Sequence, residues 1–153
     1  MRTESNTSGD LDLAVKTLHT EKKRLVLVKD GKVLLTSEAS SITPYVQAIN
    51  ALGESVTRAA LADRTIGRAA ALLSIYAKIA SAYAETISDG AIDVFSLYGI
   101  PFKYGERVPV ILNRRRDGQC PYEQVVSGLS SPEVAFRRLV QAAGTSQGKE
   151  TLN

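Results

Sequence analysis

The chain has 153 residues, of which 44% are hydrophobic and 23% are charged, and its formal net charge is +3. This composition is typical of one globular domain and excludes a disordered chain, and the single cysteine excludes an internal disulfide. No apolar run reaches the roughly 20 residues of a membrane span, and residues 1–10 lack the apolar core of a secretory signal. We therefore expect a cytoplasmic protein with no membrane partner. The mild charge and the absence of tryptophan also disfavour nucleic acid as a partner.

Residues 1–9 are polar, and we expect them to form a disordered tail. Apolar residues at helical spacing then predict a helix over residues 10–21, with Asp10 as its N-cap. Two β-rich segments follow, and between them lies Asp30-Gly31, a turn dipeptide that tolerates positive φ angles. This pattern predicts a β-hairpin over residues 24–37.

The next part of the chain predicts a helix, a strand and a second helix. The first helix begins with Thr43 as its cap and Pro44 in its first turn. Residues 57–63 predict a short buried strand. Residues 65–79 are apolar on nearly every side, which predicts a helix buried on more than one face.

A second buried strand is predicted over residues 81–88. The helix after it is expected to begin at Ser88, as cap, and to end just before Gly99. The extended stretch of residues 100–112 contains prolines, which predicts a strand at the edge of the sheet.

Two closing helices are predicted, over residues 120–129 and 131–144, and residues 145–153 are expected to be a flexible tail. A hairpin followed by alternating strands and helices predicts an α/β fold with a mixed sheet, in which antiparallel and parallel strands are joined. We expect a three-layer α/β/α sandwich, formed by a single domain over residues 10–144.

Several motifs occur in an order that resembles an uncharacterised bacterial and archaeal family with a cytidine-deaminase-like fold, the domain of unknown function 1893. They are "VLVKDGKVL", "ADRTIGRAAALL", "AYAETIS", "YGI", "VPVILNR" and "CPYEQVV", and they cover roughly Leu11 to Leu139. The resemblance implies the deaminase sandwich, but it supplies no reaction.

Active zinc deaminases of this fold carry a His/Cys-Ala-Glu motif and a Pro-Cys-x-x-Cys motif at two helix starts. In the corresponding places this chain has "ADRTIG" and "ISDGAI", which contain neither histidine nor cysteine. The single histidine, His19, lies in the first predicted helix. A catalytic zinc needs three protein ligands around an open position. We therefore expect a protein without zinc, any other metal or a cofactor.

Helix N-termini that open into one cleft attract anions. We expect a small anionic or nucleotide-like ligand to bind at two such helix starts, through Arg64, Thr65, Gly67, Arg68 and Ser88. The two arginines are four residues apart, which would place them on one helix face. Gly67 would let a ligand or a neighbouring strand approach the backbone. Alternatively, the arginines pair with Asp63, Glu85 or Asp89 and the glycine only packs.

Four residues are candidates for catalysis, namely Asp63, Glu85, Cys120 and Glu123. Glu85 lies late in a predicted strand, at the edge where open α/β sheets bind ligands. Cys120 stands at the start of a predicted helix and follows three arginines, a setting that activates a thiolate. Glu123 completes a motif resembling a capping box and would oppose that activation. Alternatively, Cys120 is a packed and inert helix cap.

Three functions remain open at this point. The first is a zinc-free protein of the deaminase fold that binds a small anionic or nucleotide-like ligand. The second is an enzyme with Cys120 as nucleophile or redox thiol, assisted by Asp63, Glu85 or Glu123. The third is a structural or regulatory module, in the form of a homo-oligomer. We rank binding above catalysis, because the chain has no second histidine to act as a general base near neutral pH.

Overall fold

The computed structural model describes residues 2–152, with side chains described for residues 9–144. The elements are α1 (Arg2–Thr20), β1 (Leu25–Lys29), β2 (Lys32–Ser37), α2 (Thr43–Leu52), a 3-10 turn (Gly53–Val56), β3 (Ala60–Ile66), α3 (Arg68–Tyr76), β4 (Ser81–Ser88), α4 (Asp89–Tyr98), β5 (Phe102–Val108), α5 (Pro121–Val125) and α6 (Pro132–Leu152). The flexible tails expected at residues 1–9 and 145–153 lie almost entirely outside the residues whose side chains are described. The two tails, and the domain bounds drawn from them, therefore stay predictions.

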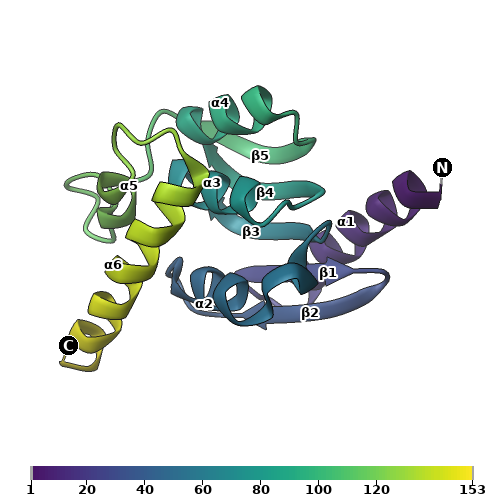
Figure 1. The fold of residues 1–153 in the computed structure, drawn as a ribbon, viewed down its shortest axis with the longest axis horizontal. Helices are drawn as coiled ribbons and strands as arrows, with labels where there is room; N and C mark the ends of the chain where they lie inside the picture. The colour runs from purple at the N-terminus through teal and green to yellow at the C-terminus, as the bar shows by residue number, and fades with distance from the viewer. Residues whose placement is uncertain (1, 153) are drawn as a thin grey trace.

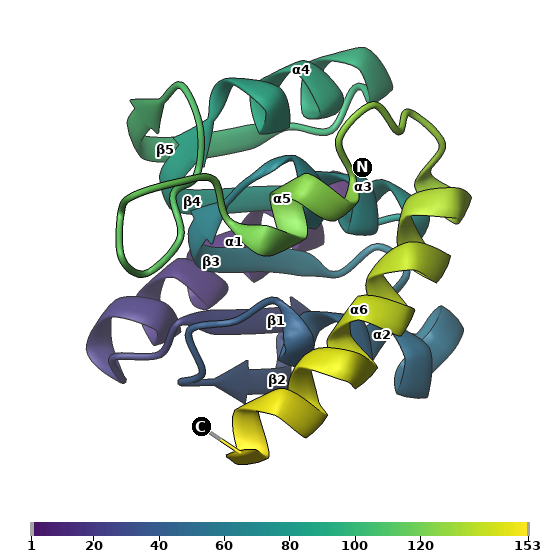
Figure 2. The ribbon, with the colours of Figure 1, turned by 90° about the vertical axis from the view of Figure 1, so that its left-hand side faces the viewer.

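The strands form one mixed five-stranded sheet in the order β2-β1-β3-β4-β5, which Figure 2 shows. β1 is antiparallel to both β2 and β3, whereas β3, β4 and β5 are parallel. The predicted α/β fold with a mixed sheet is therefore confirmed, and β5 lies at an edge of the sheet, as the prolines of residues 100–112 indicated.

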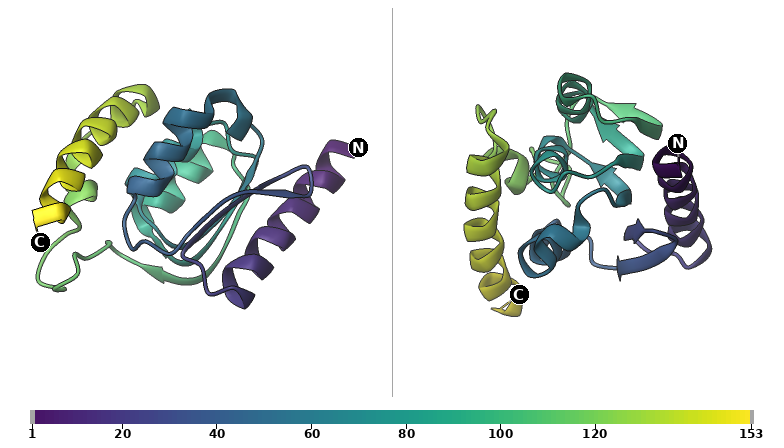
Figure 3. Two further views of the ribbon diagram at one scale, coloured as in Figure 1. Left: turned by 90° about the horizontal axis from the view of Figure 1, so that it is seen from below. Right: turned by 45° about the vertical axis from the view of Figure 1, so that its right-hand side comes forward.

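Helices cover both faces of the sheet. Of the described helices, α1 is the one that lies on one face, where Leu18 and Ala14 pack on Val26 and Ala62. α2, α3 and α4 cover the other face over the larger core. α5 and α6 lie outside α2 and α3, so that α6 and α1 are at opposite sides of the molecule (Figure 1 and Figure 3). Within the described residues, no helix has the length and apolar character needed to cross a membrane.

The predicted hairpin is confirmed, with its turn at Asp30 and Gly31, which have φ angles of 52° and 76°. The prediction that Asp10 caps α1 is wrong. Asp10 lies inside the helix and is buried, and its carboxylate accepts hydrogen bonds from the backbone N–H groups of Asp30 and Gly31 at 2.9 and 2.8 Å. One carboxylate of α1 thus holds the tip of the hairpin.

The boundary between β3 and α3 differs from the prediction. β3 continues to Ile66 because Thr65 and Ile66 pair with Thr86 and Ile87 of β4. α3 begins only at Arg68, after the extended residue Gly67. Residues 64 and 65 therefore belong to a strand, and side chains on a strand alternate between its two faces.

Other helix ends agree more closely with the sequence. The hydroxyl of Ser88 accepts a hydrogen bond from Ala91 N–H, and Gly99 ends α4 in the left-handed conformation, as predicted. Thr43 is the first residue of α2 rather than its cap, because Ile42 occupies the cap position. α5 ends at Val125, which is shorter than the predicted helix over residues 120–129.

Candidate functional site

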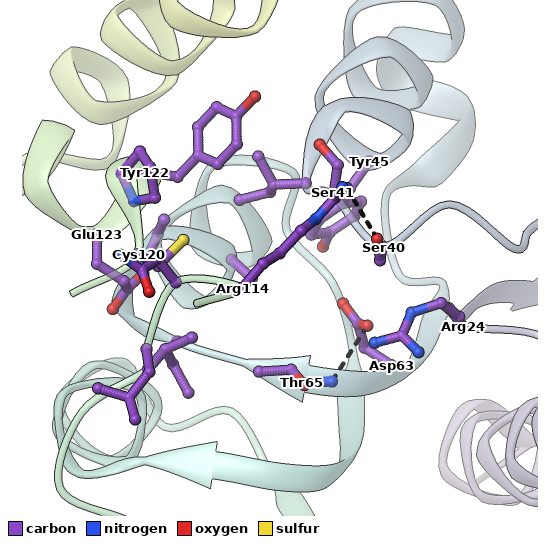
Figure 4. Close-up of a pocket in the computed structure, with 18 of the residues that line it drawn as sticks. Arg24, Ser40, Ser41, Tyr45, Asp63, Thr65, Arg114, Cys120, Tyr122 and Glu123 are labelled. Atoms are coloured by element: carbon purple, nitrogen blue, oxygen red, sulfur yellow. Dashed lines mark hydrogen bonds between the residues drawn. The ribbon is translucent and has the colours of Figure 1, made fainter. Parts of the chain in front are cut away.

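A cavity of about 680 Å³ opens on the face of the sheet that α2 and α3 cover, where β3 ends and α3 begins (Figure 4). Its walls come from the start of β1, the approach to α2, the end of β3, the start of α3, and the loop that leads from β5 into α5. The polar residues that line it are Arg24, Ser40, Ser41, Tyr45, Asp63, Thr65, Asn113, Arg114, Arg115, Cys120, Tyr122 and Glu123. A volume of this size is typical of small-molecule sites.

Asp63 faces this cavity because odd-numbered residues of β3 point toward α2 and α3. Burial raises the pKa of its carboxyl to about 7, although backbone N–H groups of Thr65 and Arg64 and the charge of Arg24 act in the opposite direction. The hydrogen bond from Thr65 N–H to Oδ1 is long, at 3.4 Å. Asp63 is therefore a carboxyl that changes protonation near neutral pH.

Glu123 is a second carboxylate of the cavity, and it has a different role. Its two oxygens accept hydrogen bonds from the backbone N–H groups of Arg68 and Ala69, at 2.9 and 2.8 Å. Burial raises its pKa, and these two donors lower it. Glu123 therefore caps α3 from another part of the chain. It occupies the helix N-terminus at which the sequence predicted a bound anion.

Gly67 explains how this cap fits. A Cβ atom at Gly67 would lie 2.6 Å from the carboxyl carbon of Glu123, closer than real Cβ contacts. The sequence suggested that Gly67 permits close approach by a ligand or a strand, and the group that approaches is a side chain of the same protein. Arg68 points away from the cavity and donates a hydrogen bond to the carbonyl of Leu129.

Arg64 does not share a face with Arg68, and the expected common helical surface is wrong. Arg64 lies on the α1 side of β3, where its guanidinium donates to the carbonyls of Leu18 and Lys23 at 2.9 and 2.8 Å and pairs with Glu85. His19 Nε2 lies 3.3 Å from Glu85 Oε2. The alternative pairing of Arg64 with Glu85 is the one the structure contains, and both lie away from the cavity.

Ser88 is also outside the cavity, because its buried hydroxyl caps α4. Asp89 beside it pairs with Arg107, at 2.6 Å, instead of with either predicted arginine. Of the nine predicted site residues, the structure brings together Asp63, Thr65, Gly67, Cys120 and Glu123 in one cavity. It places Arg64, Arg68, Glu85 and Ser88 elsewhere.

Cys120 is half-buried and lines the cavity, and Figure 4 shows its sulfur pointing toward the cavity. It occupies the N-cap position of α5, but its side chain makes no capping hydrogen bond, and the helix has only five residues. The neighbouring Arg114 extends from the loop to Ser40, with Nη2 3.0 Å from the hydroxyl oxygen. A thiol and a guanidinium thus face the same space, as the sequence suggested.

The sequence did not identify several wall residues as parts of a site. Tyr45 is buried, its hydroxyl lies 2.7 Å from that of Ser74, and burial raises its pKa. The hydroxyl of Tyr122 lies 3.4 Å from that of Thr43, which connects α5 to α2. Arg24 follows Lys22 and Lys23 in the chain, and nothing in the sequence indicated that it approaches Asp63.

Metal ligation can be assessed from the donor groups present. Among residues 9–144, no group of three or more histidine, cysteine, aspartate or glutamate side chains is arranged to hold a metal ion. His19 and Cys120 lie on opposite sides of the sheet, since His19 contacts Glu85 on the α1 face. The described residues thus offer no zinc site of the deaminase kind.

A crystal structure of a DUF1893 family protein (TM1506) from Thermotoga maritima is similar to this chain, with a TM-score of 0.76 and 24% sequence identity. The similarity covers 88% of this chain and 90% of the other, and at that identity it shows a shared fold. No curated protein matches this chain. A family model, TM1506: Domain of unknown function (DUF1893), matches residues 13–142. Because the match covers most of its length, the chain belongs to the DUF1893 family.

Proposed function

We propose that this protein has a cytidine-deaminase-like fold without zinc and that it binds a small anionic or nucleotide-like ligand in the cavity. The proposal of the fold rests on the sequence motifs, on the strand order β2-β1-β3-β4-β5 and on helices covering both faces of the sheet. The proposal of a ligand rests on the cavity and its charges.

The observation that carries the proposal is the position of three arginines. Arg24, Arg114 and Arg115 line the cavity, and all three are exposed. No salt bridge joins them to an acidic side chain among residues 9–144. Guanidinium groups bind phosphate and carboxylate in a bidentate manner, so they form an anion site without a helix N-terminus. The anion therefore binds at the arginines, because Glu123 already caps α3.

The test measures thermal stability with sulfate, phosphate and a nucleoside monophosphate. A ligand at 100 times its dissociation constant stabilises the fold by about 2.7 kcal/mol. The double variant Arg114→Ala, Arg115→Ala should lose this gain. The matched control is Arg137→Ala, Arg138→Ala, which removes two exposed arginines of α6 outside the cavity. If no anion stabilises the wild type, or both double variants respond alike, the proposal is wrong and a structural or regulatory role is favoured.

A thiol enzyme is a second candidate, because Cys120 and Asp63 line the same cavity. In that case the cavity holds a nucleophile together with a carboxyl whose pKa is about 7. Alkylation by iodoacetamide tests it directly. Labelling of the folded protein that a bound anion slows would support a thiol facing the ligand. Absence of labelling without denaturant would return Cys120 to the role of a packed residue.

A further inference from the structure

The two carboxylates of the cavity differ in how their oxygens are satisfied. Glu123 is only 8% exposed, and each of its oxygens accepts a hydrogen bond from a backbone N–H group. Among residues 9–144, Asp63 accepts one long bond, from Thr65 N–H at 3.4 Å. The nearby N–H of Arg64 lowers the pKa of Asp63, but its hydrogen bond goes to the carbonyl of Arg24. A carboxylate has about four acceptor positions. Asp63 therefore retains acceptor capacity that faces the cavity.

The surroundings of Asp63 do not supply the missing donors. Figure 4 shows the guanidinium of Arg24 beside it, but no salt bridge joins the two among residues 9–144. The hydroxyl of Tyr45, from α2, is engaged with Ser74. Arg114 is bonded to Ser40. The other titratable or charged groups of the cavity walls are Arg115, Cys120, Tyr122 and Glu123, and the start of α3 contributes none.

We infer that the ligand of this cavity carries a hydrogen-bond donor that Asp63 accepts, in addition to the anionic group that the arginines bind. The ligand class is thus a small bifunctional molecule, an anion with an amine or amide N–H at its other end. The inference rests on the proposed function, because it names a second group of the ligand that the same cavity binds. Asp63 is half-buried and accepts a single long hydrogen bond among residues 9–144, so a donor on the ligand would stabilise its carboxylate.

The probes are 2-, 3- and 4-carbon aminoalkanesulfonates, each compared with the alkanesulfonate of the same length. The ammonium and the sulfonate both keep their charges between roughly pH 5.5 and 8. Any pH dependence therefore reports on the protein. At pH 8, at least one amine-bearing probe should bind roughly tenfold more tightly than its partner, as expected for a charge-assisted hydrogen bond. This advantage should shrink as the pH falls through about 7, because the Asp63 carboxyl becomes protonated there.

Asp63→Asn is the matched variant, since it keeps the shape and removes the charge. It should abolish the advantage of the amine and its pH dependence. At pH 8 it should raise the affinity for alkanesulfonates, because it removes a negative charge from the cavity. Titration calorimetry measures each dissociation constant. If alkanesulfonates bind and no amine improves binding, the inference is wrong and the anion site stands. If neither probe type binds at all, the inference and the proposed function both fail. An amine advantage that persists in Asp63→Asn also overturns the inference.

Discussion

Arg64 and Asp63 are neighbouring charged residues of β3, and they have different surroundings on the two faces of the sheet. On the α1 face, Arg64 donates to two carbonyls and pairs with Glu85, so its donors connect the end of α1 to β4. On the cavity face, Asp63 has one long hydrogen bond within the described part of the chain, and its pKa is raised. The first face therefore uses its charges for stability. The second face holds the Asp63 carboxyl, which has few hydrogen-bond donors around it and a raised pKa. Such a perturbed group is typical of binding and catalytic sites.

The largest change in the free energy of unfolding is expected from a substitution of Asp63. Its pKa is about 7 in the folded protein against an ordinary 3.8, so ionisation disfavours the folded state. The free energy of unfolding should fall as the pH rises from about 4 to 7, and Asp63→Asn should not show this fall. At pH 8 the variant should be more stable than wild type by at most about 4 kcal/mol, at 1.36 kcal/mol per pKa unit.

Urea denaturation at pH 4 and pH 8 measures the difference in stability between wild type and Asp63→Asn. The exposed Asp12→Asn is the control. Equal stability of wild type and Asp63→Asn at pH 8 would remove the contrast between the two faces.

The next effect is expected at the cap of α3. Glu123→Ala leaves two backbone donors without a partner and should lower the free energy of unfolding by about 3 kcal/mol. Glu123→Gln keeps one acceptor and should lose less. Gly67→Ala should also destabilise the protein, because the new Cβ collides with the Glu123 carboxyl. In a double-mutant cycle the two losses should not add, and simple additivity would show that Gly67 serves some other contact.

On the α1 face, Arg64→Ala should lower the free energy of unfolding by about 2 kcal/mol, since it leaves the Leu18 and Lys23 carbonyls without their donor. Arg64→Lys should not restore the loss, because an ammonium cannot reach three acceptors as the guanidinium fork does. Glu85→Gln should cost less than about 1 kcal/mol, because the Glu85 side chain is 41% exposed. Chemical denaturation of the three variants tests this ranking. A larger loss in Glu85→Gln than in Arg64→Ala would contradict it.

The smallest effect is expected at Cys120. Its side chain makes no capping hydrogen bond, so Cys120→Ser should change the free energy of unfolding by less than about 0.5 kcal/mol. The thiol lines the cavity, and a bulky label on it should nevertheless weaken anion binding. Thermal denaturation of the variant and anion titration of the labelled protein provide the two measurements. Unchanged anion binding after complete labelling would separate Cys120 from the site.

The order of elements could be read from the sequence because hairpin, cap and strand signals are local. Asp30-Gly31, Ser88 and Gly99 all do what their residue types predict. The end of β3 could not be read in this way, because pairing of Thr65 and Ile66 with β4 extends the strand into a segment with helical character. That shift moved Arg64 from a predicted helix face to the α1 side of the sheet.

The candidate site was partly predictable for a related reason. The sequence singled out the segments around Asp63 and Cys120, and the fold brings both segments to one cavity. The cap that Glu123 provides to α3 joins residues 55 positions apart, and no local pattern indicates it. Arg24 and Tyr45 were missed because their part in the walls depends on how β1 and α2 pack beside β3.

The buried carboxylate of Asp10 has a consequence for the dynamics of the sheet. Amide hydrogens at a hairpin tip ordinarily exchange quickly with solvent, since few bonds protect them. Here the amides of Asp30 and Gly31 are bonded to a helix that lies across the sheet. Their exchange should be slow, and it should require α1 to detach. β2, an edge strand, would then open together with the N-terminal helix rather than fray alone, which makes helix and hairpin one cooperative unit.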